Sequence, residues 1–377
     1  MGYKTDCRLF TGYKPCVHKI KCDGCPHYDK IQSHIGIVSL EAMGAVLRST
    51  VLLEPIKRRF PHAYITWITL KNVKPLLNNN PHIDKIICLE PKTQSAVEMM
   101  EFDALFAVDK SMEAGALAMK LNAKQKFGFG MDKRGVIIPL SKHADYQYDV
   151  GLDDNLKFFE NQKPETQQLT ESMNLEWQRD PYVLELTKAE HIEVDQRREK
   201  ILEETDGATK FIGYNTGCSV LFPYKKFTID KAIELIAQWR RKFPDAAVLL
   251  LGGPEDSERQ QQIKAHFKSD ARVVNTPTTQ GLRSGVLWMA LSDLVFSGCS
   301  LGLHIAIALK KPSIAWFGVS CSQEIDLYDK GEKIIASVPC TPCWKKSCTN
   351  EPKCFDMVGL DGIMNSTERL LAGSATS

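Results

Sequence analysis

SGCSLGLHIAIA at residues 297–308 places a turn of small residues directly before a helix-period run. Short apolar runs at 294–296 and 313–317, typical of buried strands, flank this segment. Backbone N–H groups at the start of a helix have no partner within that helix and attract anions. The sequence therefore predicts an anion-binding turn between a strand and a helix.

A matching turn lies in the first half of the chain, where SLEAMGAVLR occupies residues 39–48 and also follows an apolar run. Two such turns predict two nucleotide-binding-type domains that face each other across a cleft. Strand-like and helix-period runs alternate around both turns, which indicates parallel sheets covered by helices. The expected strands are 34–40, 63–68, 85–89, 102–108, 126–129, 210–215, 247–251, 271–275, 294–296 and 313–317; the expected helices are 42–60, 73–78, 112–121, 228–243, 256–267, 281–291 and one from 301.

The length and net charge of the chain limit the kinds of molecule that it is expected to bind. The chain has 377 residues, enough for two domains, and its formal net charge is only +2. This balance supports neither nucleic-acid binding nor attachment to a membrane surface. Residues 1–30 do not resemble a signal peptide, and no apolar run is long enough to span a bilayer. We expect a cytoplasmic protein with a small-molecule partner.

Eight of the twelve cysteines form two groups of four, one near each end of the chain. Each group contains one Cys-x-x-Cys pair, and four thiolates are the ligands of a closed structural zinc site. Iron or an iron–sulfur cluster is the alternative to zinc, and reduced thiols without metal are the other interpretation. Because neither group leaves a ligand position open, we expect no catalytic metal. The ligands would be Cys7, Cys16, Cys22 and Cys25 in one group and Cys340, Cys343, Cys348 and Cys354 in the other, and one set could be shared between two chains of a homo-oligomer.

Seven motifs carry a family resemblance: LEAMGAVLRST at 40–50, KRRFP at 57–61, LLNNNPHIDK at 76–85, NTGCS at 215–219, KKFT at 225–228, GGPE at 252–255 and LHIAIALKKP at 303–312. In order and spacing they resemble glycosyltransferase family 9, which contains the ADP-heptose:lipopolysaccharide heptosyltransferases. The spacing of the C-terminal cysteines also resembles a motif of many members, some of which hold a single iron there. The N-terminal cysteine motif resembles an extension found in part of the family.

The resemblance implies an α/β protein of the GT-B type with two Rossmann-like domains. The expected parts are a Cys-rich segment at 1–30, an acceptor domain at 31–165, a donor domain at 166–338, and a Cys-rich segment with a tail at 339–377. The weak periodicity and polar character of residues 142–176 place the crossover there.

The resemblance also implies roles for individual residues. Lys225 would contact the donor diphosphate, Glu255 the ribose of the nucleotide, and Arg48 a phosphate of the acceptor. A solvated loop lysine, a core histidine at His304, and an ion pair of Arg48 with an acid are the open alternatives. The donor pocket would be lined by Thr216, Gly217, Cys299, Ser300, Leu301 and His304.

Two positions depart from the family pattern. The aspartate that usually follows the glycine of the first turn is Ala45, and the aspartate five residues before the histidine is Cys299. A methyl group cannot take a proton from the acceptor, so Glu41, in the same turn, is our candidate general base. A solvent-facing Glu41 that interacts with the helix dipole is the alternative.

Two functions follow from these observations. The first is transfer of a sugar, with heptose from ADP-heptose as the expected donor, to a glycan, the lipopolysaccharide core or a protein, with Lys225 and Glu41 as catalytic residues. The second is a catalytically silent GT-B protein that binds a nucleotide sugar or acts as a scaffold. Retention of Lys225, Glu255, His304 and Arg48 favours the first, and the replaced aspartates favour the second.

Overall fold

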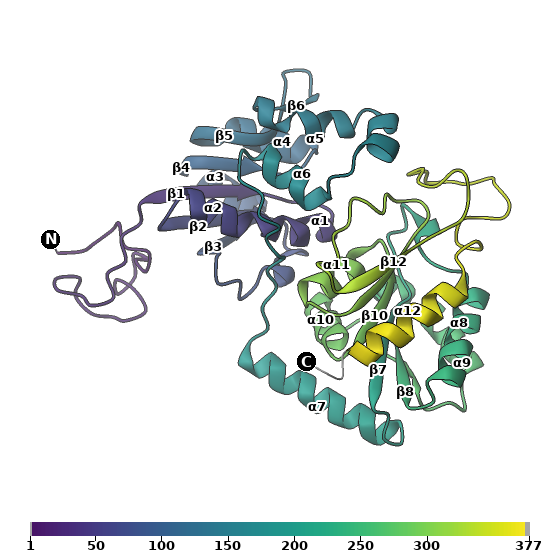
Figure 1. The fold of residues 1–377 in the computed structure, drawn as a ribbon. Coiled ribbons are helices and arrows are strands. Elements are labelled where there is room, and N and C mark those ends of the chain that lie inside the picture. Colours follow the sequence, from purple (N-terminus) through teal and green to yellow (C-terminus); the bar gives the residue numbers. More distant parts are fainter. Residues whose placement is uncertain (1, 374–377) are drawn as a thin grey trace. The chain divides into compact units, whose positions relative to one another are not determined.

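The computed structural model describes residues 2–373, which form two compact units (Figure 1). The first unit comprises the chain up to residue 152 together with residues 166–180, and the second comprises 153–165 together with the chain from 181 onward. The division differs from the single expected boundary between 165 and 166. The chain crosses between the units three times, because residues 166–180 return to pack on the first unit.

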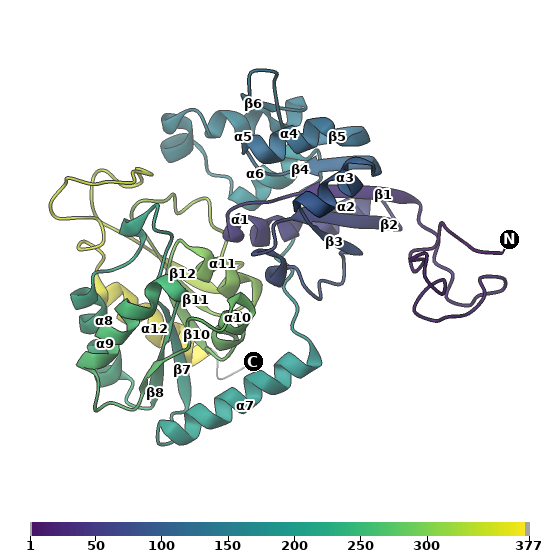
Figure 2. The same cartoon turned by 180° about the vertical axis from the view of Figure 1, so that it is seen from behind.

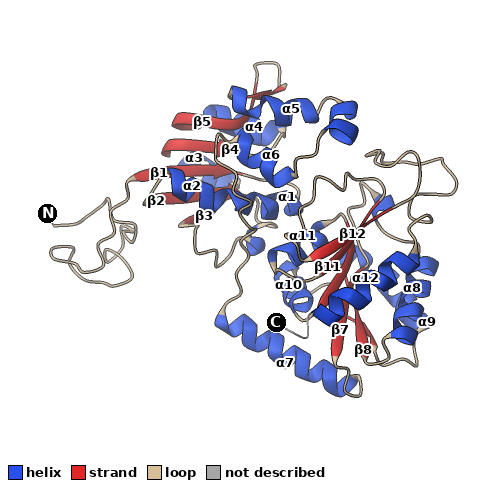
Figure 3. Cartoon of the chain, viewed as in Figure 1, coloured by secondary structure: helices blue, strands red, loops and turns tan. Residues whose placement is uncertain are grey.

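A six-stranded sheet forms the centre of the first unit (Figure 3). Its strand order is β3-β2-β1-β4-β5-β6, and every neighbouring pair is parallel except β5 with β6. The carboxyl-terminal halves of β1 and β4, residues 35–38 and 104–107, are apolar and fully buried, as expected of parallel strands covered by helices on both faces of the sheet. The strands are β1 (Ser33–Val38), β2 (Ala63–Thr69), β3 (Lys85–Cys88), β4 (Glu101–Ala107), β5 (Asn122–Met131) and β6 (Ile137–Pro139).

The helix expected at 42–60 is divided into three pieces. A 3-10 segment at Ser49–Leu52 separates two short α-helices, and Pro55 lies in the first turn of the second one. Proline has no N–H to donate, so it is tolerated in a first turn but not inside a longer helix. The helices of this part of the chain are α1 (Met43–Arg48), α2 (Leu53–Arg59), α3 (Pro91–Glu98), α4 (Met112–Lys120), α5 (Asp145–Val150) and α6 (Glu165–Ser172), with 3-10 turns at Lys74–Leu76 and Lys142–Ala144.

The second unit contains a parallel six-stranded sheet in the order β12-β11-β10-β7-β8-β9. Trp239 of α8 and Phe296 of β10 are fully buried at its centre, where their rings meet edge to face with a centroid separation of 5.6 Å. The strands are β7 (Lys210–Asn215), β8 (Ala246–Leu251), β9 (Val273–Asn275), β10 (Leu294–Gly298), β11 (Ser313–Phe317) and β12 (Gly331–Ile335).

Six α-helices accompany this second sheet. The expected helices at 228–243, 256–267, 281–291 and from 301 all form, with ends that shift by one or two residues. The helices are α7 (Lys188–Glu204), α8 (Ile229–Lys242), α9 (Ser257–His266), α10 (Leu282–Ala290), α11 (Leu301–Ala308) and α12 (Leu360–Gly373), with a π-helical turn at Leu156–Glu160 and 3-10 turns at Pro223–Lys225 and Pro254–Asp256.

Both Cys-rich segments are irregular. Among residues 2–32, the only regular pairing is an isolated bridge between Cys7 and Lys30. The rear view shows this N-terminal segment as an irregular loop (Figure 2). Arg8 fixes this segment to the rest of the first unit through Asp84, in the loop before β3, and through the backbone carbonyl of Ala63, at 2.9 Å. Arg8 also pairs with Asp29 inside the segment, at 2.9 Å. Within the described part of the chain, no helix has both the length and the apolar character needed to cross a bilayer.

Each strand order creates one switch point, where neighbouring strands connect to helices on opposite sides. In the first unit this point lies between β1 and β4, and in the second it lies between β7 and β10. Ligands of open α/β sheets bind at the carboxyl ends of the strands at such points. The two turns that the sequence singled out, after β1 and after β10, lie at these positions.

Candidate functional site

Asp109, which follows β4, is the acid at the switch point of the first unit. Its carboxylate accepts hydrogen bonds from the backbone N–H groups of Leu40 and Glu41, the latter at 3.1 Å, and from the Ser39 hydroxyl at 3.2 Å. Burial raises the pKa of Asp109, the backbone bonds oppose that rise, and the nearby Glu41 charge adds to it. The structure therefore places a half-buried carboxyl group in the turn where the sequence analysis expected only Glu41.

Glu41 itself is exposed, and its backbone N–H, rather than its side chain, provides the bond to Asp109. Ala42 has a φ of 54°, in the left-handed region, and turns the chain into α1. Ala45 and Arg48 are half-buried on that helix, and Arg48 is its last residue. The first unit thus brings Glu41 and Asp109 to the same turn, while Arg48 follows one helical turn later.

Asn215, the last residue of β7, joins the two turns at the switch point of the second unit. Its side-chain amide donates to the hydroxyls of Ser297 and Ser300, both at 2.9 Å, and to the carbonyl of Gly217 at 3.0 Å. A Cβ on Gly302 would lie 2.5 Å from the Asn215 side chain, so only glycine fits there. The predicted residues Gly217 and Ser300 therefore lie close together, on turns 82 to 85 residues apart in sequence.

The turn after β7 also packs tightly against the turn after β8. Thr216 is buried, and its hydroxyl donates to the carbonyl of Leu251 at 3.0 Å, so the side chain serves the turn itself. A Cβ on Gly217 would meet the carboxylate of Asp256 at 1.9 Å. Asp256 is buried with a raised pKa, whereas Glu255, the predicted ribose ligand, is exposed at the carboxyl end of β8.

Lys225 ends the 3-10 turn before α8 and lies beside the turn after β10. Its carbonyl oxygen would be 2.1 Å from a Cβ on Gly298, so the two backbones are in close contact. Its ammonium lies over the rings of Phe222 and Trp344, with distances of 4.9 and 3.9 Å to the ring centroids. The positive charge of Lys225 also acts on Cys299, whose thiol pKa is nevertheless raised, mainly by burial.

The remaining predicted donor residues separate into two groups. Cys299, Ser300 and Leu301 form the turn and the first residue of α11, where N–H groups of the first helical turn are available to an anion. His304 is buried one turn later, and its Nδ1 lies 3.1 Å from the hydroxyl oxygen of Tyr182. This contact favours the packing alternative for His304.

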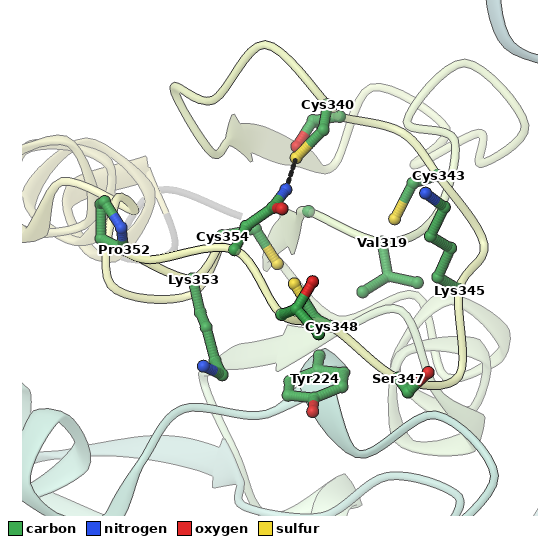
Figure 4. Close-up of a pocket in the computed structure, with 14 residues that line it drawn as sticks. Tyr224, Val319, Cys340, Cys343, Lys345, Ser347, Cys348, Pro352, Lys353 and Cys354 are labelled. Atoms are coloured by element: carbon green, nitrogen blue, oxygen red, sulfur yellow. Dashed lines mark hydrogen bonds between the residues drawn. The ribbon is translucent and has the colours of Figure 1, made fainter.

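The four C-terminal cysteines line one cavity together with Tyr224 and Val319 (Figure 4). The side chain of Asn350 donates to Cys340 Sγ at 3.4 Å. Cys343, Cys348 and Cys354 are half-buried and Cys340 is exposed, and a Cβ on Gly318 would lie 2.7 Å from the sulfur of Cys354. Burial, together with the charges of the other three cysteines, raises the pKa of Cys354 to about 11. These thiols therefore share one electrostatic environment.

The four N-terminal cysteines also line a single cavity, with Leu9, Phe10 and His27 among its other residues. The imidazole of His27 stacks on that of His18 with a centroid separation of 3.9 Å. Across residues 2–373, no three Cys, His or acidic side chains are already arranged as they would be around a bound ion.

Two α/β units, each with its ligand-facing turns at a switch point, have the architecture of the GT-B class. The family model of glycosyltransferase family 9 (heptosyltransferase) matches residues 92–354. The chain belongs to this family, and it is a glycosyltransferase related to the heptosyltransferases. This membership argues against the catalytically silent alternative.

Three relatives illustrate the similarity. Lipopolysaccharide heptosyltransferase 1 of Campylobacter coli is 25% identical over 318 residues, covering 80% of this chain and 88% of the relative. The structure of the ADP-heptose lipopolysaccharide heptosyltransferase II of E. coli superposes with a TM-score of 0.66 at 16% identity, over 91% of this chain and 100% of the other. The iron-containing dodecameric glycosyltransferase TibC from enterotoxigenic E. coli H10407 gives a TM-score of 0.51 at 11% identity, over 92% and 78%. The two structures support the fold.

Proposed function

We propose that this enzyme transfers heptose from ADP-heptose to the lipopolysaccharide core, with another glycan or a protein as the alternative acceptor. The observation that carries the donor half of the proposal is the Asn215 amide, which ties the turns after β7 and β10 together beside Lys225. The similarity to the Campylobacter coli heptosyltransferase supports both donor and acceptor.

On this proposal, the second unit stabilises the departing diphosphate. Lys225 supplies a full positive charge, and the N–H groups at the start of α11 supply oriented dipoles. Cys299 remains a neutral thiol because burial raises its pKa, so it lines the pocket without adding negative charge. Glu255, exposed at the end of β8, contacts the ribose, and Arg48 of the first unit binds a phosphate of the acceptor.

The base that takes the proton from the acceptor hydroxyl is one of two carboxyl groups in the first unit, Glu41 or Asp109. We favour Asp109, because three hydrogen bonds from the turn after β1 fix its carboxylate and burial raises its pKa toward the range useful for a general base. Glu41 was the candidate from sequence, and its exposed side chain has no comparable fixation.

We also propose that each four-cysteine group holds a structural metal. Four thiols that line one cavity in each segment provide the ligand chemistry for zinc, and the iron in TibC makes iron the alternative. A bound ion would close each loop by drawing the four sulfur atoms together. Metal analysis of purified protein is expected to give about two ions per chain. Cys354→Ser should remove one ion and Cys88→Ser none, whereas wild-type protein without metal would contradict the proposal.

Assembly and location complete the proposal. We propose a homo-oligomer in the cytoplasm, because TibC is dodecameric and clustered thiols suit a reducing compartment. Light scattering of purified protein would contradict the first part by giving the mass of a single 42.4 kDa chain.

Calorimetric titration of metal-replete protein tests the donor. ADP-heptose and ADP are expected to bind, a UDP-sugar to bind much more weakly, and Lys225→Ala to weaken ADP binding strongly while leaving an affinity that calorimetry at high ADP concentration still measures. Binding of none of these ligands would overturn the proposed donor. Transfer assays with a lipopolysaccharide core and a protein acceptor then distinguish the two acceptor classes.

A further inference from the structure

Trp344 lies in the C-terminal four-cysteine segment, directly after Cys343, and its indole ring contacts two lysines. The Nζ atom of Lys225 is 3.9 Å from the ring centroid, and that of Lys157 is 4.7 Å away. Phe222 meets the same indole edge to face, with a centroid separation of 5.2 Å. The ring therefore forms part of the surface against which the Lys225 ammonium rests.

The backbone of the segment fixes this ring. The N–H groups of Cys343 and Trp344 both donate to the carbonyl of Val319, at 3.1 and 2.9 Å. Trp344 has a φ of 48°, in the left-handed region that bulky side chains avoid. Such a conformation persists only where surrounding contacts determine it, and strained residues of this kind cluster at functional sites.

Lys225 is fixed at its other end by the main chain. Its N–H donates to the carbonyl of Phe222 at 3.2 Å, and its own carbonyl lies against Gly298. The backbone contacts fix the position of the Lys225 Cα atom, and the aromatic contacts fix the position of its Nζ atom. A flexible lysine otherwise loses considerable rotamer freedom on binding an anion, and prior orientation reduces that loss.

We propose that Trp344 is a positioning residue that holds the Lys225 ammonium in place for the donor diphosphate. The inference rests on the proposed role of Lys225, and it gives the C-terminal cysteine segment a function in donor binding. The electron-rich face of the indole attracts the Lys225 ammonium. The ammonium N–H groups that point away from the ring stay available to phosphate oxygens. Trp344 acts only through Lys225.

The test is a double-mutant cycle on ADP affinity, measured by calorimetry with metal-replete protein. Trp344→Leu is expected to weaken ADP binding by roughly 5- to 20-fold, the range of a partly desolvated cation–π contact. Trp344→Phe should restore most of the affinity, because it keeps an aromatic face. In the Lys225→Ala background, Trp344→Leu should have no further effect.

Trp288 provides the matched control. Trp288 is half-buried like Trp344, and it also makes a cation–π contact. The guanidinium carbon of Arg197, a residue of α7, lies 4.8 Å from the centroid of the Trp288 ring. Trp288→Leu should leave ADP affinity unchanged. Two outcomes would overturn this inference alone. In the first, Trp344→Leu leaves ADP affinity unchanged. In the second, Trp344→Leu weakens ADP binding by the same factor whether residue 225 is lysine or alanine. Wild-type protein that binds no ADP would overturn both it and the proposed donor.

Discussion

Asp109 illustrates how its neighbours set the chemistry of a single residue. An exposed aspartate is a weak base, but burial raises the pKa of Asp109 while the Ser39 hydroxyl and two backbone N–H groups hold its position. Asp109→Asn keeps the shape and removes the basic oxygen. We expect it to lower kcat by about 10²- to 10⁴-fold, the usual contribution of general base catalysis, with ADP affinity unchanged. Steady-state transfer kinetics measure the first quantity and calorimetry the second.

Glu41→Gln is the matched variant in the same turn, and it should retain nearly full activity. A large loss in Glu41→Gln together with an active Asp109→Asn would assign the base to Glu41 instead. The pH profile gives independent support. Because the base works only when deprotonated and the Asp109 pKa is raised, kcat/KM should fall on acidification, starting at a higher pH than for an ordinary aspartate.

Gly217 tests how tightly the donor turn is packed. An added Cβ would meet the Asp256 carboxylate at 1.9 Å, and that carboxylate cannot move without losing its 3.0 Å bond from the Gly253 N–H. We expect Gly217→Ala to lower the free energy of unfolding by about 1–3 kcal/mol and to weaken ADP binding. Gly285→Ala in α10 is the control, because nothing lies within 4 Å of its Cβ. That variant should match or slightly exceed wild-type stability in chemical denaturation.

At the scale of the element, α7 depends on an ion pair more than on apolar packing. Of its 17 residues only Ile201 is buried, and its first turn is fixed by a capping box between Thr187 and Glu190. The guanidinium of Arg283 binds both carboxylate oxygens of Glu190, at 2.6 and 2.8 Å. Hydrogen bonds from Arg283, followed by those from Thr187, lower the pKa of Glu190 to about 2.

A lowered pKa contributes stability above the ordinary pKa of the carboxyl group, and that stability is lost as the pH falls toward 2. We expect Glu190→Gln to lower the free energy of unfolding at pH 7 by about 1–2 kcal/mol, allowing for solvent screening. The difference should shrink as the pH falls from 4.5 toward 2. Denaturation across this pH range checks it, with Glu193→Gln, in the exposed pair with Arg197, as a control of small effect. A difference independent of pH would contradict the mechanism.

Sequence predicted the strands far better than this helix. Buried parallel strands such as β8 are unbroken apolar runs, and all ten expected strands form. α7 was not predicted because its own residues are polar on nearly every face of the helix. Its sequence therefore lacks the apolar stripe by which an amphipathic helix is identified. Its only local signal is the pairing of Thr187 with Glu190, a capping box. The strands β6 and β12 and the helices α3, α5, α6 and α12 were also not predicted.

At the scale of the whole molecule, the site residues that sequence missed are those that depend on topology. Asp109 belongs with the turn at Ser39 only because β4 pairs with β1, although the two residues are 70 positions apart. Trp344 reaches Lys225 only because the C-terminal segment bonds to Val319 after β11. Turns with a local signature, such as 215–219 and 297–301, were predicted directly. Their contact through Asn215 required the strand order.

The same dependence on distant contacts governs how the chain returns to the first unit at residues 166–180. Arg58 of α2 binds both oxygens of Asp180, at 2.6 and 2.8 Å, and the carbonyl of Glu176 at 3.1 Å. Asp180 is buried, with 10% of its side chain exposed, so water only partly screens its attraction to Arg58. Removal of the carboxylate would leave the Arg58 guanidinium without this counter-charge. We therefore expect Asp180→Ala to lower the stability of the first unit by about 1–2 kcal/mol.

Hydrogen exchange locates that effect within the molecule. Amides of residues 166–180 should exchange faster in Asp180→Ala, because opening of this segment no longer breaks the bidentate pair. Amides of α8 and β8 in the second unit should keep their wild-type rates. Glu368→Ala, which breaks the more exposed pair with Lys242 in the second unit, should leave exchange at 166–180 unchanged. Equal acceleration in both units of Asp180→Ala would instead mean that the chain opens as one cooperative body, and that residues 166–180 do not belong to the first unit alone.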